Sequence, residues 1–490
     1  MHFVNLTPLF TLAPGVRLRR EHFGGIAFSK NTGTLVELDR PAFTLLSRME
    51  AQGPCKEEDL AGGSEESRGK LLRELLQLGI LCHVRSHPKQ KPVWNELSLQ
   101  WPKTKCLTAP ETVHWAITYR CNNSCPDCYA ARYRDDFKGE LTTTQALRLV
   151  DKLAGWGVFQ LSIGGGEPLL RSDLAAIASR AKEKGLVVHI TTGMNEIADS
   201  TLQTLAGSVT ALQIGINHGR LLTKPEEETP KLQKLVGWAE RSGIVIGANL
   251  MLSKTVLTNF PRLCKQLQAA GFENLTLLRY KPPATLDRWE EEHPKLDSLV
   301  AFQSTLWELA EKNPQLNLRL DCALSFFASE LSPAASEARG LRGCVAGERI
   351  LALTPQASAF PCSQLIAPSH LAGNLLTDDP AQIWQGAKVL KQYRAFRQSP
   401  TFRDSQCGIC EARVHCGGCR VFAPDSLGGD PLCPLPQLPP LQQLGKIGRK
   451  LDLAKYLESA AEITVGKYME RYVVVQKRAL SELRNNPDLT

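Results

Sequence analysis

The chain has 490 residues, enough for several domains, and its 43% hydrophobic and 22% charged residues are ordinary values that exclude a disordered protein. A net charge of +8 is mild for this length, so it does not require a nucleic-acid partner. The N-terminus lacks a cationic stretch before its short apolar run, and no segment approaches twenty apolar residues. We therefore expect a cytoplasmic protein without a signal peptide or a membrane span.

Fifteen cysteines in a chain without an export signal indicate reduced thiols, for which metal binding is the best interpretation. Ten of these cysteines fall into motifs that are described below. The remaining cysteines are scattered, and we expect them to be small buried residues rather than ligands: Cys55, Cys82, Cys106, Cys264 and Cys322.

Residues 10–86 form the first predicted unit, with two short strands near 25–29 and 34–38 joined by a turn. Asp39 should cap a first helix, and Gly79 should end a second helix in the left-handed conformation. Apolar residues expected on the inner faces of the two helices are Phe43, Leu46, Met49, Leu71, Leu72, Leu75 and Leu76. This layout predicts a winged helix-turn-helix.

A linker at 87–109 precedes residues 110–325, in which predicted strands and helices alternate. The apolar strand candidates are 112–119, 158–164, 186–192, 211–217, 244–252 and 275–280. Such alternation implies parallel strands joined by right-handed crossovers, and six units predict an α/β fold with a partial (β/α)6 barrel. Ligands of these folds bind at the carboxyl ends of the strands.

The last two regions differ from the barrel in composition. Residues 340–435 carry seven more cysteines among many Gly, Pro and polar residues, so this loop-rich region should need metal to fold. After a proline-rich break, residues 441–490 return to a helical spacing of apolar residues. We expect this C-terminal tail to form one or two docking helices.

Three cysteines follow the first strand of the predicted barrel, namely Cys121, Cys125 and Cys128 in the segment TYRCNNSCPDCY. A structural zinc site is closed by four ligands, so three thiolates look incomplete. An iron–sulfur cluster held by three thiolates leaves one iron free for another ligand. The spacing alone also fits part of a zinc knuckle.

The second strand ends in the glycine-rich segment 163–168, which contains Gly165, Gly166 and Glu167. Glycines allow the backbone to approach a ligand closely, and an acidic side chain can receive a cationic amine. Beside a three-thiolate cluster, such a pocket would suit an amino acid whose amine and carboxylate chelate the free iron.

The two motifs together, CxxxCxxC after the first strand and GGEP after the second, resemble the radical S-adenosylmethionine (SAM) superfamily. The resemblance implies that Cys121, Cys125 and Cys128 hold a [4Fe–4S] cluster and that SAM binds its free iron. The glycine-rich segment would hold the methionyl amine. Reductive cleavage of SAM would then give methionine and a 5′-deoxyadenosyl radical, which abstracts hydrogen from the substrate.

The chain departs from this family pattern at several positions. Asp127 precedes the third cysteine, where relatives usually have an aromatic residue that packs near the adenine. Asn217 stands where relatives often have Asp, and it could hydrogen-bond the SAM ribose or belong to a structural turn. Arg279 could contact SAM, which we favour, or simply occupy a strand end. The sequence assigns no catalytic residue, because no His, Asp or Tyr can be placed at the substrate.

The cysteines of residues 340–435 form a second motif. Their two CxxC pairs alone would fit a zinc ribbon, but seven cysteines suit two clusters better. The region resembles the SPASM domain, an auxiliary-cluster extension of radical SAM enzymes that modify peptides and proteins. The segments HCGGCR and DPLCP carry this resemblance. The resemblance implies one cluster on Cys344, Cys362 and Cys419, with no evident fourth ligand, and a second on Cys407, Cys410, Cys416 and Cys433.

The N-terminal unit lacks a basic footprint, because residues 1–90 hold 12 Lys and Arg against 10 Asp and Glu, so we do not expect it to bind DNA. It resembles the RiPP recognition element, the PqqD-like fold that is fused to maturases of ribosomally made peptides. Residues 14–49 and the LLRELLQLGIL segment carry this resemblance. Its hairpin would leave a strand edge to which a leader peptide can add. A cap that packs on the barrel or makes a dimer is the alternative.

We therefore predict a radical SAM oxidoreductase that modifies a ribosomally synthesised precursor peptide, with the leader bound by the N-terminal unit. A C–C or thioether cross-link is the expected product, and splicing or epimerisation are alternatives. The electron donor would be a protein such as flavodoxin or ferredoxin, and no nucleic-acid or membrane partner is expected. Maturation of a folded protein, a small-metabolite substrate and an iron–sulfur transcription regulator are the other hypotheses.

Overall fold

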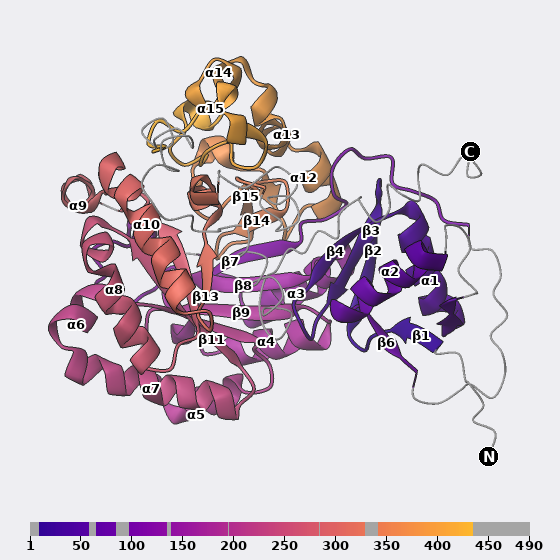
Figure 1. Cartoon of the computed structure of the whole chain (residues 1–490), viewed down its shortest axis with the longest axis horizontal. Helices are drawn as coiled ribbons and strands as arrows, with labels where there is room; N and C mark the ends of the chain where they lie inside the picture. The colour runs from indigo at the N-terminus through magenta and orange to yellow at the C-terminus, as the bar shows by residue number, and fades with distance from the viewer. Residues whose placement is uncertain are drawn as a thin grey trace. The chain divides into compact units, whose positions relative to one another are not determined.

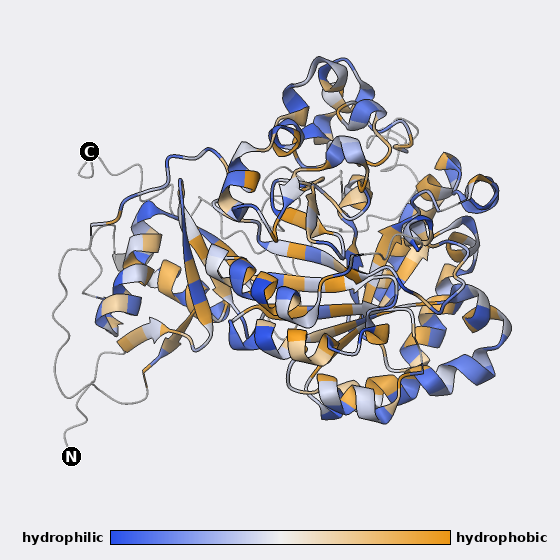
Figure 2. Cartoon of the chain, turned by 180° about the vertical axis from the view of Figure 1, so that it is seen from behind, coloured by the Kyte–Doolittle hydropathy of each residue, from blue (hydrophilic) through white to orange (hydrophobic). Residues whose placement is uncertain are grey.

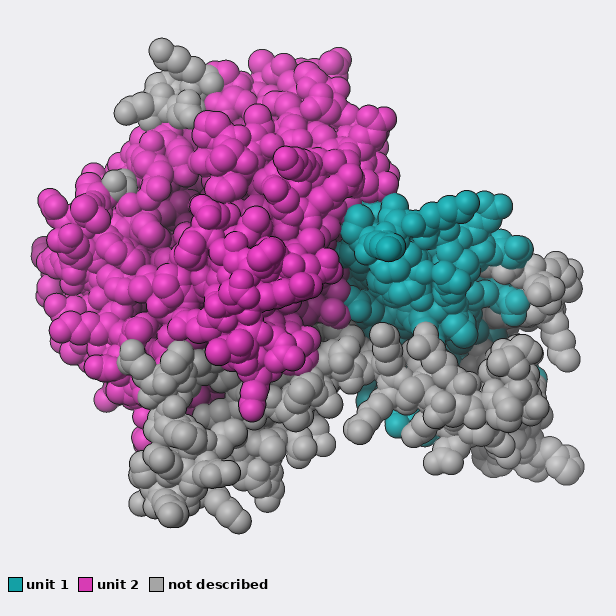
Figure 3. Space-filling model, turned by 90° about the horizontal axis from the view of Figure 1, so that it is seen from above, with its two compact units in different colours: residues 1–108, 334–340, 461–490 teal, residues 109–333, 341–460 magenta. Residues whose placement is uncertain are grey.

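The computed structural model describes the following parts of the chain: 9–57, 65–84, 98–134, 139–194, 196–283, 285–328 and 342–434. Two compact units are present (Figure 3): unit 1 comprises 1–108, 334–340 and 461–490, and unit 2 comprises 109–333 and 341–460. The predicted C-terminal tail, 441–490, lies outside the described residues. None of the helices in the described ranges is long and apolar enough to cross a membrane.

The described residues of unit 1 form two small antiparallel sheets and two helices (Figure 1). One sheet has the order β2-β3-β4, and the other has the order β5-β1-β6. The elements are β1 Leu9–Leu12, β2 Val16–Glu21, β3 Gly24–Ser29, β4 Leu35–Asp39, α1 Arg40–Gln52, β5 Cys55–Lys56, α2 Glu65–Gln77 and β6 Leu81–His83.

The two helices of unit 1 form for the local reasons expected from the sequence. The Asp39 carboxylate caps α1 by accepting a hydrogen bond from the Ala42 amide at 3.0 Å. Gly79 ends α2 with a φ of +66°, a conformation that favours glycine. The side chains that share the unit 1 core include Phe43, Leu46, Met49, Leu71, Leu72 and Leu75. The strands β3 and β4 confirm the predicted hairpin, whereas β2 is not predicted by the sequence pattern.

Unit 2 is built on a ten-stranded sheet with the order β13-β12-β11-β10-β9-β8-β7-β14-β15-β16. The strands β7 to β13 run parallel, which confirms the predicted α/β alternation and adds a seventh parallel strand after the six expected ones. These strands are β7 Thr112–Thr118, β8 Gln160–Gly165, β9 Val187–Thr192, β10 Ala211–Gly215, β11 Val245–Leu252, β12 Asn274–Arg279 and β13 Asn317–Leu320.

The connecting helices of unit 2 are amphipathic and pack their apolar faces on the strands (Figure 2). The helix α3 shows the local logic, because Thr142 and Gln145 form a reciprocal capping box at its start. The helices are α3 Thr143–Trp156, α4 Leu174–Glu183, α5 Asp199–Leu205, α6 His218–Thr223, α7 Pro225–Arg241, α8 Lys254–Ala269, α9 Leu286–Glu292 and α10 Leu296–Lys312.

The cysteine-rich region continues the same sheet. Its first strand, β14, runs parallel to β7, with Leu351 opposite Val113 and Leu353 opposite Trp115. A hairpin and a short third strand then extend the sheet in antiparallel fashion. The elements of this region are β14 Ile350–Leu353, β15 Ser358–Phe360, β16 Gly373–Asn374, α12 Pro380–Gly386, α13 Lys388–Arg394, α14 Pro400–Arg403 and α15 Gln406–Ile409.

Candidate active site

The loop after β7 brings the first three motif cysteines together. Cys121 and Cys128 are half-buried, Cys125 is exposed, and the Cys128 amide donates a hydrogen bond to the Cys125 carbonyl at 3.3 Å. Burial raises the pKa of the Cys125 thiol, and negative charge on Cys128 or Cys121 would raise that pKa further. The thiols are therefore close enough to interact electrostatically at the carboxyl end of a parallel strand.

Two glycines allow the end of β8 to press against this cysteine loop. Gly165 has a φ of +117°, and a Cβ on Gly166 would lie 2.2 Å from the carbonyl oxygen of Arg120. The Gly166 amide donates to the Thr118 carbonyl at 2.8 Å, and the Glu167 amide donates to the Arg120 carbonyl at 2.8 Å. A larger residue at either glycine would separate the two strand ends.

Glu167 joins the ends of β8 and β9. Its buried carboxylate accepts hydrogen bonds from Thr192 Oγ1 at 2.8 Å, from the Leu169 amide at 3.1 Å and from the Gly193 amide at 3.1 Å. Burial raises the pKa of Glu167 despite these donors. Burial raises the pKa of the Cys121 thiol, and the negative charge of Glu167 raises it further. The carboxylate therefore lies beside the cysteine loop. A contact with the methionyl amine of SAM stays a prediction.

Asn217 and Arg279 already have protein partners. Asn217 caps α6, because its Oδ1 accepts a hydrogen bond from the Arg220 amide at 3.1 Å. Arg279, at the end of β12, forms a buried ion pair with Asp430 and donates to the Leu432 carbonyl at 2.6 Å. A contact between either side chain and SAM stays a prediction, and for Arg279 it would require this network to change.

Asp127, the position that departs from the family pattern, belongs to a polar network that sequence reasoning missed. Its Oδ1 accepts hydrogen bonds from Arg288 Nε at 2.7 Å and from the Tyr280 hydroxyl at 2.9 Å. The Trp289 ring stacks on Tyr280 with 5.6 Å between ring centroids. The carboxylate thus ties the cysteine loop to β12 and α9 instead of presenting an aromatic ring.

The second group of thiols lies in two sets. In one set, the pKa of Cys416 is raised to about 11. Burial is the largest cause, and negative charge on Cys407 or Cys410 adds to it. The Cys407 sulfur accepts a hydrogen bond from the Asp430 amide at 3.3 Å, and the Cys433 amide donates to the Asp430 carbonyl at 3.3 Å. The structure therefore brings Cys407, Cys410 and Cys416 close together, and the Asp430 backbone connects Cys407 with Cys433.

The other set consists of Cys344, Cys362 and Cys419, and the thiols of Cys362 and Cys419 interact with the ammonium group of Lys281. Burial raises the pKa of Cys362 to about 11 and that of Cys419 to about 12, whereas Lys281 lowers both. Negative charge on Cys344 would raise both pKa values. Lys281 lies two residues after the end of β12, and nothing else in the sequence around it indicates this role.

Thiolate donors in these numbers fit iron–sulfur chemistry. Within the described ranges, no three Cys, His, Asp or Glu side chains stand in metal-binding geometry as they are. The fit instead rests on the donor set: thiols from one loop affect one another's pKa, and iron binding requires their deprotonation. In the loop after β7, Cys121, Cys125 and Cys128 are not paired in disulfides, so their thiols can serve as ligands.

Residues 115–237, which contain the cysteine loop and the glycine-rich strand end, match the sequence model of the Radical SAM superfamily. This chain contains a radical SAM domain. The predictions of an enzyme and of SAM and a [4Fe–4S] cluster as cofactors are thereby confirmed. The assignment of individual ligands to these cofactors remains with the proposals below.

Several known proteins resemble much of the chain. An AdoMet-dependent heme synthase of Methanosarcina barkeri is 27% identical over 66% of this chain and 96% of its own length. The mycofactocin maturase MftC of Mycobacterium ulcerans is 29% identical over 67% of this chain and 88% of its own length. The structure of Streptococcus suis SuiB bound to precursor peptide SuiA shares the fold, with a TM-score of 0.61, 17% identity and coverage of 84% of this chain and 96% of SuiB.

Proposed function

We propose that this radical SAM enzyme oxidatively modifies a ribosomally synthesised precursor peptide. The observation that carries the proposal is the arrangement of two further thiol sets at the same sheet as the radical SAM loop, on a region whose first strand pairs with β7. Thiols in such numbers beside a radical SAM site suit electron removal from a substrate radical. A C–C or thioether cross-link is the product that we favour.

The comparisons support a peptide as the substrate. One relative is a mycofactocin maturase, and the SuiB structure contains a precursor peptide. The likeness to SuiB covers 84% of this chain, a share that unit 2 alone cannot supply, so it extends into unit 1. This coverage supports the proposal that both chains join an N-terminal unit to a radical SAM fold.

In the proposed site, Cys121, Cys125 and Cys128 hold the [4Fe–4S] cluster that binds SAM. The bound cofactors supply a 5′-deoxyadenosyl radical, which abstracts a hydrogen atom from the peptide. The backbone of Gly165 and Gly166 keeps the strand end close to the cysteine loop. Glu167 holds the neighbouring strand end through Thr192 Oγ1 and the Gly193 amide, and its negative charge favours a cationic amine beside the loop.

The two remaining thiol sets would hold auxiliary clusters in a SPASM-type region. Cys344, Cys362 and Cys419 bind the first cluster, and Lys281 provides a positive charge that offsets the thiolates. The ligands of the second cluster are Cys407, Cys410, Cys416 and Cys433. These clusters would pass electrons from the oxidised peptide to an acceptor, whereas a protein such as flavodoxin or ferredoxin would reduce the radical SAM cluster.

Unit 1 would act as a recognition element for the peptide's leader. In its sheet of order β2-β3-β4, the strands β2 and β4 lie at the edges, and an extended peptide can add to such an edge through backbone hydrogen bonds. The nearly balanced charge of residues 1–90 supports a peptide rather than DNA as the ligand. Fifteen cysteines with metal-ligand spacing in ten of them suit a reducing compartment, so we place the enzyme in the cytoplasm.

A small-metabolite substrate is the second candidate, because a heme synthase matches 66% of the chain. The two candidates differ in what unit 1 must do. A peptide maturase with a recognition element needs unit 1 for substrate binding, whereas a metabolite enzyme does not. Binding of a fluorescent leader peptide to the full chain, and its loss when β2 or β4 carries a proline, separates them.

The experiment that tests the proposal is an anaerobic reaction of the reconstituted full chain with SAM, dithionite and the peptide encoded beside its gene. Mass spectrometry should find a loss of two hydrogens per cross-link, while loss of a larger fragment would indicate splicing. An unchanged mass with deuterium uptake from solvent would indicate epimerisation. SAM cleavage without any change in the peptide would contradict the proposal.

A further inference from the structure

An eighth cysteine lies beside the thiols of the first auxiliary set. Cys322 begins a short 3-10 helix, Cys322–Ala328, directly after β13. The preceding Asp321 binds Lys281 Nζ at 2.5 Å, and the Asp321 Oδ1 accepts a hydrogen bond from the Ala323 amide at 3.0 Å. The Ser325 hydroxyl donates to the Cys322 carbonyl at 2.8 Å. These contacts fix the Cys322 backbone at the end of a barrel strand.

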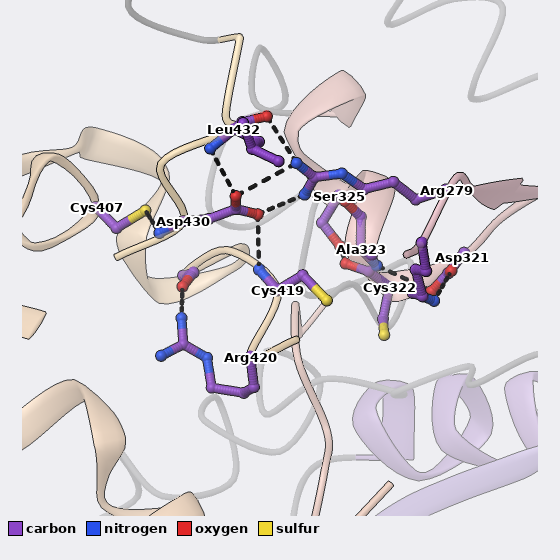
Figure 4. A network of polar contacts seen from close by, with 12 residues as sticks. Arg279, Asp321, Cys322, Ala323, Ser325, Cys407, Cys419, Arg420, Asp430 and Leu432 are labelled. Carbon is purple, nitrogen blue, oxygen red and sulfur yellow. Dashed lines mark hydrogen bonds and ion pairs between the residues drawn. The ribbon is translucent and has the colours of Figure 1, made fainter. Parts of the chain in front are cut away.

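Arg279 joins this turn to the turn that carries Cys419. Its guanidinium donates to the Ala323 carbonyl at 3.3 Å and pairs with Asp430, whose Oδ2 accepts a hydrogen bond from the Cys419 amide at 3.0 Å. One buried cation therefore spans the two backbone segments. Figure 4 shows that the sulfur atoms of Cys322 and Cys419 lie on the same side of this guanidinium.

The other two thiols of the set come from the ends of one hairpin. Cys344 precedes β14 and Cys362 follows β15, and the hairpin pairs these strands with Leu353 opposite Ala359. The Gly347 amide donates to the Pro361 carbonyl at 3.0 Å, which closes the base of the hairpin. The two cysteines are thus held near each other by backbone pairing.

Three of these thiols, those of Cys322, Cys362 and Cys419, lie close enough to Lys281 to interact with its ammonium group. Cys344 and Cys419 in turn lie close enough to Cys322 to interact with its thiol electrostatically. Burial alone would lower the pKa of Lys281, but Asp321 and the thiols of Cys419, Cys322 and Cys362 raise it. The Lys281 ammonium group and its Asp321 partner therefore stand beside thiols from three separate segments of the chain, and iron binding would require these thiols to be deprotonated.

We propose that Cys322 is the fourth cysteine ligand of the first auxiliary cluster, completing the set of Cys344, Cys362 and Cys419. This inference rests on the proposed function for the existence of that cluster. With four thiolates the cluster has no open iron, so it transfers electrons and does not bind the peptide directly. Lys281 offsets part of its negative charge.

The other scattered cysteines do not compete for this role. Cys264 is fully buried in α8 among the apolar side chains of the core, and burial raises its pKa to about 12. Cys55, Cys82 and Cys106 belong to unit 1. Cys322, in contrast, is exposed, so its thiol is accessible to an incoming iron atom. The sequence interpretation of Cys322 as a small buried residue is therefore wrong.

The test uses the full chain with Cys121, Cys125 and Cys128 all changed to Ala, so that only auxiliary clusters remain. After anaerobic reconstitution this parent should hold about eight iron atoms. Its reduced EPR spectrum should not change when cyanide is added. Adding Cys322→Ala should open one iron, so cyanide should shift the spectrum and mild oxidation should give a three-iron signal. Adding Cys264→Ala to the parent instead is the matched control and should leave both readouts unchanged.

A second measurement covers the case in which Cys322→Ala does not fold. In the wild-type chain, iodoacetamide should alkylate Cys322 about tenfold or more slowly after cluster reconstitution than before, while Cys106 should react equally in both states. The ligand assignment alone would be overturned by three results together. These are two clusters in the parent, a Cys322→Ala spectrum that cyanide does not shift, and rapid alkylation of Cys322 in the loaded wild-type enzyme. A parent without iron would overturn the auxiliary clusters as well, and normal clusters without peptide modification would overturn only the proposed function.

Discussion

Asp127 and Arg288 form a two-point ion pair between the cysteine loop and α9, with Arg288 Nε 2.7 Å from Oδ1 and Arg288 Nη2 3.1 Å from Oδ2. The pair is partly shielded, since Asp127 is 8% and Arg288 20% exposed. It anchors a loop that must present three thiols together. Asp127 thus has a structural role in holding the cysteine loop against α9.

We expect Asp127→Ala to lower the free energy of unfolding of the apo chain by about 2 kcal/mol. The change removes the carboxylate that accepts hydrogen bonds from Arg288 and from the Tyr280 hydroxyl. It should also reduce the iron bound by the radical SAM loop. Asp127→Asn should cost less, since the amide oxygen can still accept from Tyr280. Denaturant unfolding and iron analysis measure both effects, and Asp297→Asn on the exposed start of α10 is a control that should change stability by less than about 0.5 kcal/mol.

Gly166→Ala should disrupt the contact between β8 and the cysteine loop. The added Cβ would lie 2.2 Å from the Arg120 carbonyl oxygen, so the backbone must shift, and the cost should be about 1–3 kcal/mol. SAM cleavage per loaded cluster should fall about tenfold or more, because reacting groups that move by an ångström lose their alignment. In Gly155→Ala, where no atom lies within 4 Å of the new Cβ, the helix should instead gain about 0.5–1 kcal/mol.

The raised pKa of Glu167 predicts a specific pH dependence. Because burial favours the protonated carboxyl in the folded chain, the folded state binds more protons than the unfolded state just above the ordinary pKa of 4.5. The stabilisation from this protonation is present below that value and is lost as pH rises through the folded pKa. Unfolding of the apo chain should therefore show wild type gaining stability relative to Glu167→Gln as pH falls through this window. A constant difference would mean that Glu167 titrates normally.

Removing one partner of the buried pair between Arg279 and Asp430 should cost about 3–5 kcal/mol, because the other charge is left without compensation. The double variant Arg279→Met with Asp430→Leu should cost less than the sum of the single changes. Auxiliary iron content should fall in each single variant. If Arg279 also contacts SAM, Arg279→Lys will weaken SAM binding measured by calorimetry; an unchanged affinity would restrict it to the structural role.

The barrel and the thiol motifs were predictable because their signals are local. Apolar runs of strand length alternate with helical patterns, and the cysteines of each CxxC or CxxxC group lie within one turn of chain. The glycine positions were also predictable, because a glycine-rich segment at a strand end indicates a close approach of backbone. Gly165 and Gly166 lie against the backbone at the end of the neighbouring strand β7.

The remaining features depend on contacts between distant segments. Asp127 and Arg288 are 161 residues apart, and Arg279 and Asp430 are 151 residues apart. The pairing of β14 with β7 and the approach of Cys322 to Cys419 are equally long-range. Nothing in the composition around Cys322 distinguishes it from a core cysteine, because its significance comes only from the strand end on which it lies.

The most direct test of the central claim measures 5′-deoxyadenosine and peptide product together. Anaerobic, iron-loaded wild type should release 5′-deoxyadenosine under reduction with dithionite and change the mass of the precursor peptide, and the variant Cys125→Ala should do neither. Fully loaded protein that forms no 5′-deoxyadenosine, or a native cysteine loop that holds zinc in place of iron, would contradict the account.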